Sequence, residues 1–350
     1  MKTMFSHHSP HAALLSKVSL CWFGLLVAAC SPYGDVQMFL TDGLRPPVVT
    51  TVRFTSATRI EISCDTPLQR AALRTDPPTV ISDSGIEGDM AWFELAEEVA
   101  IGSRYALFAA LQGRNGHSAQ VMRWAYGYNP RPVDMILNEV IMRGSGNNPD
   151  CLEFLVRSGG NLGGTAWYLG TSAVHDAAYI FPAVEVAAGD YIILHVRPEG
   201  LPEEQDELGA DLALSGGKQS HPQARDLWLP EAVGLPSNNG VLTLYSSPDG
   251  ELLDALLYSN RSSASDTAYR GFGTTKMLGW VDSLAEQGGW IGEYELLRPE
   301  DAVSPEGSTG TRSVNRRYPP VVTRSRSDWH IVPTLGATMG SQNSNEIYEP

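Results

Sequence analysis

Two glutamates, Glu139 and Glu153, come closest among the residues of this chain to acid–base chemistry. Each lies within an apolar, strand-like segment, residues 135–142 and 152–156. If they are neighbours they could act as paired carboxylates, because two carboxyl groups in one site have pKa values that are pushed apart, so that one serves as acid and the other as base. The alternative is that both only accept hydrogen bonds from loops, and we expect this role rather than catalysis.

Other catalytic and metal-binding patterns are missing from the sequence. It has no Gly-x-Ser-x-Gly at a strand-to-helix turn, no cysteine with partner histidines and no Cys/His spacing typical of zinc. The acidic segment 199–211 offers oxygen ligands for calcium but lacks the alternation of a calcium loop, so a solvated acidic face is the alternative. The sequence therefore predicts a protein that is not an enzyme and that needs neither a metal ion nor a cofactor.

Five aromatic side chains are gathered in the polar part of the chain between residues 259 and 312. They could form a ligand surface for a sugar or a peptide, because aromatic rings combine a large apolar area with a defined geometry. The alternative is that they attach a helix within this segment to the rest of the fold. The five candidate residues are Tyr269, Phe272, Trp280, Trp290 and Tyr294.

The charge of the chain limits the kind of partner. The formal net charge is −15, which opposes binding to nucleic acid or to an anionic lipid surface and favours cationic partners. A local basic strip interrupts this acidity, and we expect its side chains to pair with acids of the same domain. The strip consists of Arg316, Arg317, Arg324 and Arg326.

Residues 1–29 have the composition of a secretory signal peptide. Lys2 and Lys17 stand before an apolar run, from residue 18 to residue 29, that is too short to span a membrane. Removal of these residues takes away two lysines and no acid, so the net charge changes from −15 to −17. The pattern predicts export.

The apolar run ends in Leu26-Val-Ala-Ala-Cys30-Ser31, which resembles the bacterial lipobox. The resemblance implies that Cys30 becomes the lipidated, palmitate-bearing first residue of a lipoprotein, and that Ser31 directs the protein to the outer membrane. Acyl chains at roughly 0.8 kcal/mol per buried CH₂ would hold it there, with residues 30–45 as a tether. The alternative is an ordinary signal peptide with a chance cysteine.

The clearest structural element is a β-hairpin over residues 241–258. The apolar runs Val241-Leu-Thr-Leu-Tyr245 and Leu252-Leu-Asp-Ala-Leu-Leu-Tyr258 flank Ser246-Ser-Pro-Asp-Gly250. Pro248 fixes its φ, Asp249 can bond to its own backbone and Gly250 is expected to supply a positive φ, so the chain can reverse.

A first β-domain is expected over residues 46–128, followed by a stiff proline-rich linker, residues 129–133. Residues 99–117 resemble the end of bacterial immunoglobulin-like or fibronectin type III-like modules, in which an Asn-Gly turn precedes the last strand. The resemblance implies a β-sandwich. Strand patterns are found at residues 48–56, 59–64, 104–111 and 120–126.

A series of short motifs runs through residues 134–343. It includes Ile136-Leu-Asn-Glu-Val140, Trp167-Tyr-Leu169, Ala188-Gly-Asp-Tyr191, Leu235-Pro-Ser-Asn-Asn-Gly240, Ser313-Val-Asn-Arg316 and Asp328-Trp329. In this order they resemble the lamin-tail domain, which implies an immunoglobulin-like β-sandwich used as a non-catalytic module in bacterial secreted and surface proteins. Two features depart from the family: no second acid follows Glu153, and residues 259–312 are an insertion.

Within the insertion, Met277, Trp280, Val281 and Leu284 fall on one face of a helix predicted over residues 275–287, which Gly288 and Gly289 end. We expect this insertion to be separable from the sandwich and to carry partner binding. Residues 344–350 are a C-terminal tail.

Cys64 and Cys151 are the cysteines left after residue 30. They could pair across the two domains, but we expect both to be buried as small apolar residues.

Together these patterns predict an all-β protein of two immunoglobulin-like sandwiches in tandem, the second lamin-tail-like with a partly helical insertion. The predicted function is that of an envelope lipoprotein, anchored through the acyl chains on Cys30, with a structural, adhesive or protein- or glycan-binding role. The alternative is an accessory module that targets a secreted hydrolase or nuclease system.

Overall fold

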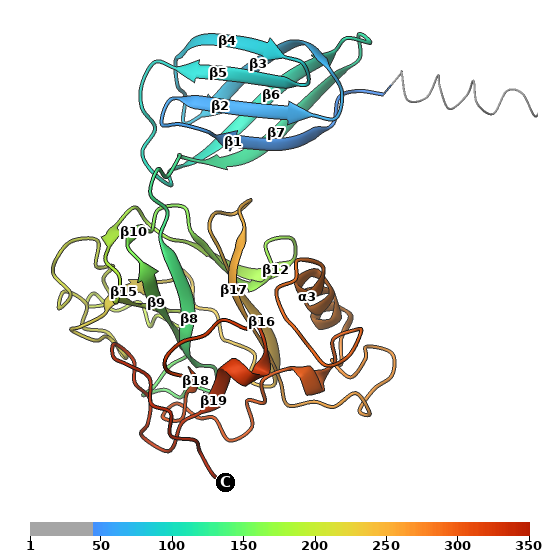
Figure 1. The fold of residues 1–350 in the computed structure, drawn as a ribbon. Coiled ribbons are helices and arrows are strands. Elements are labelled where there is room, and N and C mark those ends of the chain that lie inside the picture. Colours follow the sequence, from blue (N-terminus) through green and yellow to red (C-terminus); the bar gives the residue numbers. More distant parts are fainter. Residues whose placement is uncertain (1–44) are drawn as a thin grey trace, which may run out of the picture. The chain divides into compact units, whose positions relative to one another are not determined.

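The computed structural model describes residues 45–350 and is almost entirely β, with 39% of residues in strands and 6% in helices. The signal peptide of residues 1–29, Cys30 and the tether before residue 45 lie outside the described residues. Contacts group most of residues 45–123 into one compact unit and most of residues 124–350 into another (Figure 1). No helix within residues 45–350 is long and apolar enough to cross a membrane.

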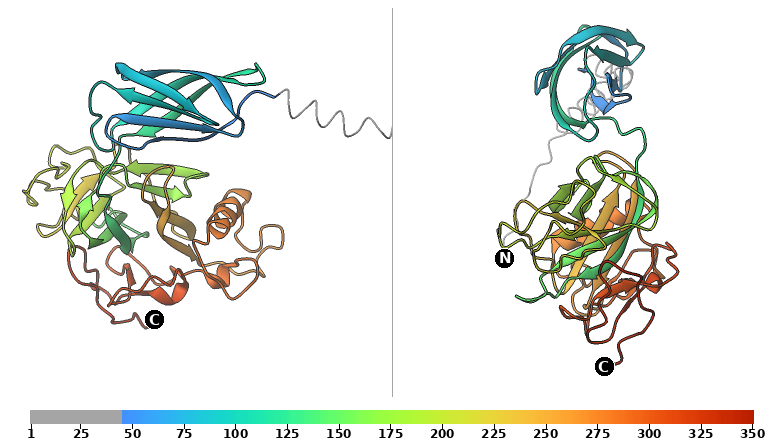
Figure 2. Two further views of the ribbon diagram at one scale, coloured as in Figure 1. Left: turned by 45° about the horizontal axis from the view of Figure 1, so that its top comes forward. Right: turned by 90° about the vertical axis from the view of Figure 1, so that its left-hand side faces the viewer.

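The first unit is a sandwich of two antiparallel sheets, which the right-hand view of Figure 2 shows as separate layers. Alternating burial in β2 and β5 directs Ile60, Ile62 and Phe93 into the space between the sheets. One sheet has the order β1 (Val49–Phe54), β2 (Arg59–Cys64), β5 (Met90–Leu95) and β4 (Ile81–Glu87); the other has β3 (Leu68–Asp76), β6 (Arg104–Gly113) and β7 (Ser118–Tyr126).

Three strands of this sandwich are missing from the sequence-based prediction. β3 is rich in alanine and arginine, and β4 is mostly polar, so neither has the β-branched alternation that predicts a strand. Both lie at the edge of their sheets, where one side of the strand has no neighbouring strand to select for apolar residues. The third, β5, carries the alternation that is typical of a strand, with Phe93 buried, so its own sequence pattern is sufficient to predict it.

The second unit is also a sandwich. Its larger sheet has the order β15 (Arg225–Trp228), β14 (Tyr191–His195), β9 (Cys151–Ser158), β8 (Asp134–Ile141), β18 (Val314–Arg316) and β19 (Trp329–Ile331). The smaller one has β12 (His175–Ile180), β11 (Ala166–Gly170), β16 (Asn239–Tyr245) and β17 (Leu252–Ser259), and β10 (Gly160–Asn161) pairs with β13 (Glu185–Val186). Apolar residues of both sheets, among them Phe154 and Leu256, form one core.

The predicted hairpin is confirmed, because β16 and β17 pair with Val241 opposite Leu257. The expected role of Gly250 is wrong in one respect. Its φ does not lie in the left-handed region, which other glycines of the described chain adopt. Instead, a Cβ at residue 250 would come within 2.7 Å of the Ser247 main-chain nitrogen, so glycine is needed there for space.

The insertion folds as predicted but packs differently from what we expected. The helix α3 (Thr275–Glu286) begins after Thr274, whose hydroxyl accepts a hydrogen bond from the Met277 N–H at 3.1 Å. Met277, Trp280, Val281 and Leu284 are its buried residues, and they belong to the same hydrophobic core as the two sheets (Figure 1). The insertion is therefore part of the core of the second sandwich and not a separable addition.

Cys64 and Cys151 are both buried and unpaired, as expected. Cys64 ends β2 of the first sandwich and Cys151 begins β9 of the second.

Candidate functional site

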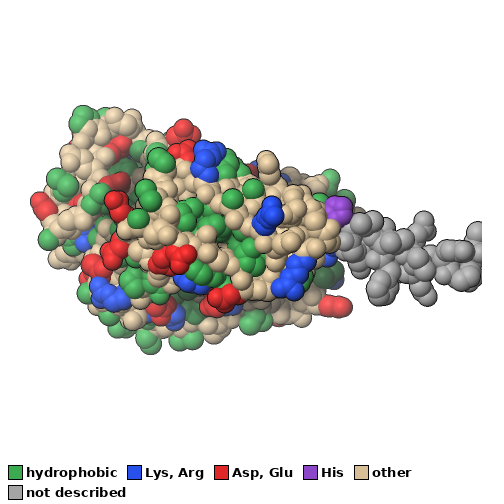
Figure 3. Space-filling view, turned by 90° about the horizontal axis from the view of Figure 1, so that it is seen from above, with side chains coloured by type: hydrophobic (Ala, Val, Ile, Leu, Met, Phe, Trp, Pro, Cys, Tyr) green, Lys and Arg blue, Asp and Glu red, His purple; other side chains and the backbone are tan. Residues whose placement is uncertain are grey.

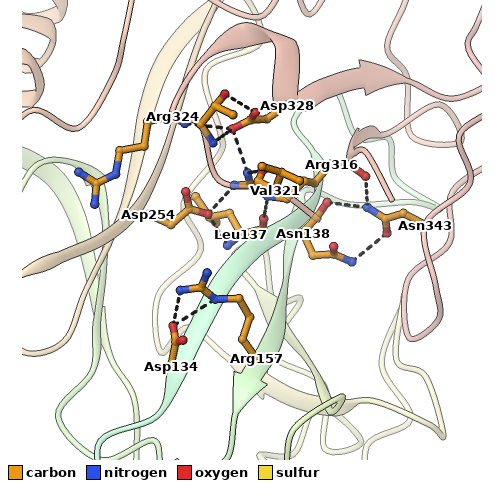
Figure 4. A network of polar contacts seen from close by, with 11 residues as sticks. Asp134, Leu137, Asn138, Arg157, Asp254, Arg316, Val321, Arg324, Asp328 and Asn343 are labelled. Carbon is orange, nitrogen blue, oxygen red and sulfur yellow. Dashed lines mark hydrogen bonds and ion pairs between the residues drawn. The ribbon is translucent and has the colours of Figure 1, made fainter. Parts of the chain in front are cut away.

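The charged centre of the second sandwich is Arg316, at the end of β18, whose side chain is 1% exposed. Its guanidinium forms ion pairs with Asp254 of β17 and with Asp328, the latter at 3.3 Å (Figure 4). Nε also donates to the Leu137 carbonyl at 2.7 Å, and the guanidinium carbon lies 4.3 Å from the centre of the Trp329 ring. This one side chain therefore ties β8, β17 and the segment before β19 together.

Burial is the main influence on the ionisation of Asp254. Desolvation raises the pKa of its carboxyl group, and the charge of Arg316 and the N–H of Leu137 partly offset that effect. Since both partners are inaccessible to water, the pair can hold strands in place but cannot meet a solute.

An amide pair extends this network toward the C-terminus. Asn138 Nδ2 donates to Glu153 Oε1 at 2.6 Å and to Asn343 Oδ1 at 2.8 Å. Asn343 Nδ2 in turn donates to the carbonyls of Asn138 and Arg316, at 2.9 and 2.8 Å (Figure 4). Asn343 thus binds the C-terminal segment to the sheet at β8 and β18.

Glu139 and Glu153 are neighbours, as the first of our two interpretations requires. They face each other across β8 and β9, and both are fully buried. Burial raises the pKa of both carboxyl groups, and the charge of Glu139 raises that of Glu153 further. Ionising two adjacent buried carboxyl groups together is unfavourable. The pair therefore retains a proton at pH values at which an ordinary glutamate is already ionised.

The partners of this pair belong to the C-terminal part of the chain. Glu139 accepts hydrogen bonds from the Ser313 hydroxyl at 2.5 Å and from the N–H and hydroxyl of Thr338 at 3.0 and 2.7 Å. Glu153 accepts one from the Gly340 N–H. The carboxyl groups hold residues 338–340 over the sheet, which confirms the hydrogen-bonding role that we expected.

A row of Cys151, His195 and Asp226 escaped sequence-based prediction. Cys151 and His195 are direct partners on β9 and β14, and His195 Nε2 lies 2.7 Å from Asp226 Oδ1. The imidazole stacks on Trp228 with centroids 3.8 Å apart, and its Nδ1 has no hydrogen-bond partner among the described atoms. Only the strand register could have shown this, because the three residues are far apart in sequence.

The chemistry of this row is limited by burial. Desolvation, followed by the nearby charge of Glu139, raises the pKa of the Cys151 thiol well above its usual value. A nucleophilic cysteine needs the opposite, namely a lowered pKa and access to a substrate. Cys151 is fully buried, so the arrangement is that of a packed polar core.

The acidic segment 199–211 uses its carboxylates to fix its own backbone. Glu204 accepts hydrogen bonds from the N–H groups of Glu199, Gly200 and Leu201 at 2.7 to 3.0 Å. Glu207 accepts from the N–H groups of Ser215 and Asp226. Within residues 45–350, no group of three or more His, Cys, Asp or Glu side chains is arranged to hold a metal ion.

The five aromatic candidates do not form one exposed surface, which corrects that interpretation. Phe272, Trp280 and Trp290 are at most 4% exposed and belong to the core, where their area holds the insertion against the sheets. Tyr269 is half-buried, and Tyr294 is 42% exposed, with the Arg298 guanidinium 4.3 Å from its ring centre. The five residues therefore do not share a ligand surface, because the three buried rings cannot touch a ligand.

Three exposed apolar side chains lie within six residues of one another in the chain; we call them the Tyr294 patch. They are Ile291, Tyr294 and Leu296, and Ile291 and Leu296 are 61% and 60% exposed. The Ile291 N–H donates to the Arg324 carbonyl at 2.6 Å, which joins this segment to the one that follows β18.

The arginines of the predicted basic strip bond to acids and main-chain carbonyls of their own domain. Arg316 pairs with buried acids as described, and Arg326 pairs with Glu293 at 2.9 Å. Arg317 and Arg324 donate to main-chain carbonyls, those of Ser327 and of Gly288. The strip therefore links loops of its own domain.

A family model for the TP_1001 protein second domain matches residues 133–331, which is more than half of this chain. The chain belongs to the TP_1001 second-domain family. A Treponema pallidum (strain Nichols) protein, described only as an uncharacterized protein, is 29% identical over 170 residues. The alignment covers 48% of this chain and 43% of that protein, so the chain spans less than half the length of this curated relative.

Two solved structures share a remote likeness. A DUF4876 family protein from Bacteroides thetaiotaomicron is 9% identical, with 76% of this chain and 84% of that chain covered and a TM-score of 0.27. The N-terminal part of the bacterial S-layer protein SbsC is 11% identical, with 47% and 44% covered and a TM-score of 0.26. Neither likeness carries an argument about function.

The TP_1001 second-domain match contains most of the polar core. Glu139, Glu153, His195 and Arg316 lie within the matched residues 133–331. Thr338 and Asn343, which cover the glutamates, follow the matched region.

Proposed function

We propose that this protein is a non-catalytic module of the bacterial cell envelope, anchored by lipid on Cys30, with a structural, adhesive or protein- or glycan-binding role. The observation that carries the non-catalytic part is the use of Glu139, Glu153 and Arg316. Each of these buried groups is bonded to strands or loops of its own domain. Groups committed to holding a fold in this way are poor candidates for contact with a substrate.

The second sandwich is proposed to be lamin-tail-like. Support comes from the order of the short motifs and from two sheets that enclose one core, with the motif residue Arg316 at the centre of the buried ion-pair network. The alternative function, targeting of a secreted hydrolase or nuclease system, would use the same fold with a different surface.

Lipid attachment is tested by labelling with radioactive palmitate in a bacterial host. The proposal expects label in the wild-type protein and none in Cys30→Ala. Cys21→Ala is the matched control, because Cys21 lies within the apolar run nine residues earlier and should not affect labelling. Equal labelling of Cys30→Ala and wild type would refute the anchor.

A binding role is tested on the Tyr294 patch. We expect Tyr294→Ala combined with Leu296→Ala to reduce retention of an envelope protein or glycan by at least tenfold, because both side chains are exposed. Leu335→Ala is the control, since Leu335 is 81% exposed and lies outside the patch. Unchanged retention in the double variant would exclude the patch as the binding surface.

A further inference from the structure

The charges of the first sandwich are divided unequally between its two sheets. Strands β1, β2, β5 and β4 carry four acids, Glu61, Asp83, Glu87 and Glu94, and two arginines. Strands β3, β6 and β7 carry one acid and four arginines, which are Arg70, Arg74, Arg104 and Arg123. The sheet of β3, β6 and β7 is therefore cationic, although the whole chain has a net charge of −15.

The outer face of this cationic sheet combines arginines with apolar side chains. On β3, the exposed Ala72 and Arg74 lie opposite Ala110 and Phe108 of β6. On β7, the alternate residues Met122 and Trp124 are 45% and 43% exposed. Figure 3 shows cationic and apolar side chains next to one another on the side of the molecule that is seen from above. The face thus offers both charge and apolar area to a ligand.

Two of the arginines lie over aromatic rings. The guanidinium carbon of Arg74 is 4.2 Å from the centre of the Phe108 ring, and that of Arg104 is 3.6 Å from the centre of the Trp124 ring. Stacking uses the flat face of a guanidinium and leaves the N–H groups at its edge for a carboxylate, which can accept two of them. It also restricts the side chain before a ligand arrives, so that binding costs less conformational entropy.

A polysaccharide that carries carboxylates matches this face better than nucleic acid does. Arg70 and Arg74 are about 13 Å apart along an extended strand, whereas duplex DNA carries one charge per roughly 1.7 Å. The face could neutralise few phosphates, and the negative charge of the chain would repel the others. In an acidic polysaccharide the charges are spaced by sugar rings, whose apolar faces can pack on Met122 and Trp124.

We propose that the outer face of β3, β6 and β7 binds a carboxylated polysaccharide. Arg74 and Arg104 bind carboxylates of the polymer, and Met122 and Trp124 pack against its sugar rings. This assignment rests on the glycan-binding role proposed above and gives that role a class of ligand. It uses neither the lipid anchor nor the Tyr294 patch, which belongs to the second sandwich.

Binding of the full chain to polygalacturonate, a polymer of carboxylated sugars, tests the site by isothermal titration calorimetry. Arg74→Ala combined with Arg104→Ala should weaken binding at least about tenfold, because two charged hydrogen-bond donors are lost. Arg53→Ala should have less than about a twofold effect, since Arg53 is exposed on β1 of the other sheet. Equal affinity of the double alanine variant and the wild type would overturn the proposal.

A second pair of substitutions separates stacked arginines from positive charge alone. Arg74→Lys combined with Arg104→Lys keeps both charges but removes the planar, bidentate donors, so the affinity for polygalacturonate should fall at least about threefold. Wild-type affinity in this variant would contradict binding through the stacked guanidinium groups.

Two further probes decide the class of ligand. Methyl-esterified polygalacturonate has the same rings without the charge, so it should bind at least about tenfold more weakly. Equal binding of the ester would overturn the role of the arginines, and tighter binding of single-stranded oligothymidylate would assign the face to nucleic acid instead. Tyr294→Ala combined with Leu296→Ala should bind polygalacturonate as the wild type does, which distinguishes failure of this site from failure of the Tyr294 patch.

Discussion

Glu139 on β8 and Glu153 on β9 lie directly opposite each other, fully buried beneath residues 338–340. The pair accepts hydrogen bonds from two hydroxyls, from the Asn138 amide and from main-chain N–H groups, and none of these donors is a cation. A proton retained by the pair therefore takes the place of a counter-ion. We expect the contacts of the C-terminal segment to depend on pH for this reason.

Stability should fall as pH rises through the raised pKa values of this pair. The folded state keeps a proton that the unfolded state has released above its usual pKa of about 4.3. The contribution of the pair to stability is thus fully present below the pKa of the unfolded state, and it is lost as the pH rises through the raised pKa values of the folded state. Glu153→Gln removes one of the two carboxyl groups. Above pH 5 the free energy of unfolding of this variant should therefore fall less steeply than that of the wild type, and the two slopes should differ by up to about 1.4 kcal/mol per pH unit.

Urea unfolding between pH 5 and pH 9 measures this slope. Glu251→Gln is the control, because Glu251 is exposed and its carboxylate takes part in none of these contacts. Parallel pH profiles for Glu153→Gln and wild type would contradict a retained proton.

Loss of Arg316 should strongly destabilise the second sandwich. Arg316→Met leaves the buried carboxylates of Asp254 and Asp328 without their cation, and removing one partner of a buried ion pair costs about 3–5 kcal/mol. Adding Asp254→Asn should recover part of that loss. Arg317→Met, a change at the adjacent and exposed residue, should stay within about 0.5 kcal/mol. Similar unfolding free energies for the two single variants would show that the ion pairs do not contribute.

Truncation of Trp280, a core residue of the insertion, should lower the free energy of unfolding of the second sandwich. Trp280 is 2% exposed and belongs to the main core, so Trp280→Ala should cost about 3–5 kcal/mol, whereas the exposed Tyr294→Ala should cost less than about 1 kcal/mol. Chemical denaturation followed by circular dichroism measures both. If Trp280→Ala retained wild-type stability, the insertion would be separable after all.

The two free cysteines within residues 45–350, Cys64 and Cys151, should resist alkylation while the protein is folded. Burial raises the pKa of Cys64 to about 11, and that of Cys151 rises well above its usual value. At pH 8 the Cys64 thiol holds about a hundredfold less thiolate than an ordinary cysteine. Iodoacetamide should modify both only after denaturation, as judged by peptide mass spectrometry, with Asp83→Cys as a rapidly labelled control. Fast labelling of Cys151 in the folded protein would point to an accessible thiol.

Local sequence chemistry predicted the elements whose residues already fit their surroundings. The hairpin of β16 and β17 follows from two apolar runs around a proline- and glycine-containing turn. Helix α3 follows from the spacing of Met277, Trp280, Val281 and Leu284, which the structure buries as a group. In contrast, β3 and β4 were missed, because an edge strand carries polar and small residues that have no strong strand preference.

The sequence by itself therefore determined the β class, the hairpin, the helix and the burial of Cys64 and Cys151. Only the tertiary structure decided that Glu139 meets Glu153, that Cys151 lies beside His195, and that Trp280 and Trp290 are core residues rather than a ligand surface. The physical reason is range. A turn or a helix face is set by residues a few positions apart, whereas strand register and desolvation depend on residues brought together from distant parts of the chain.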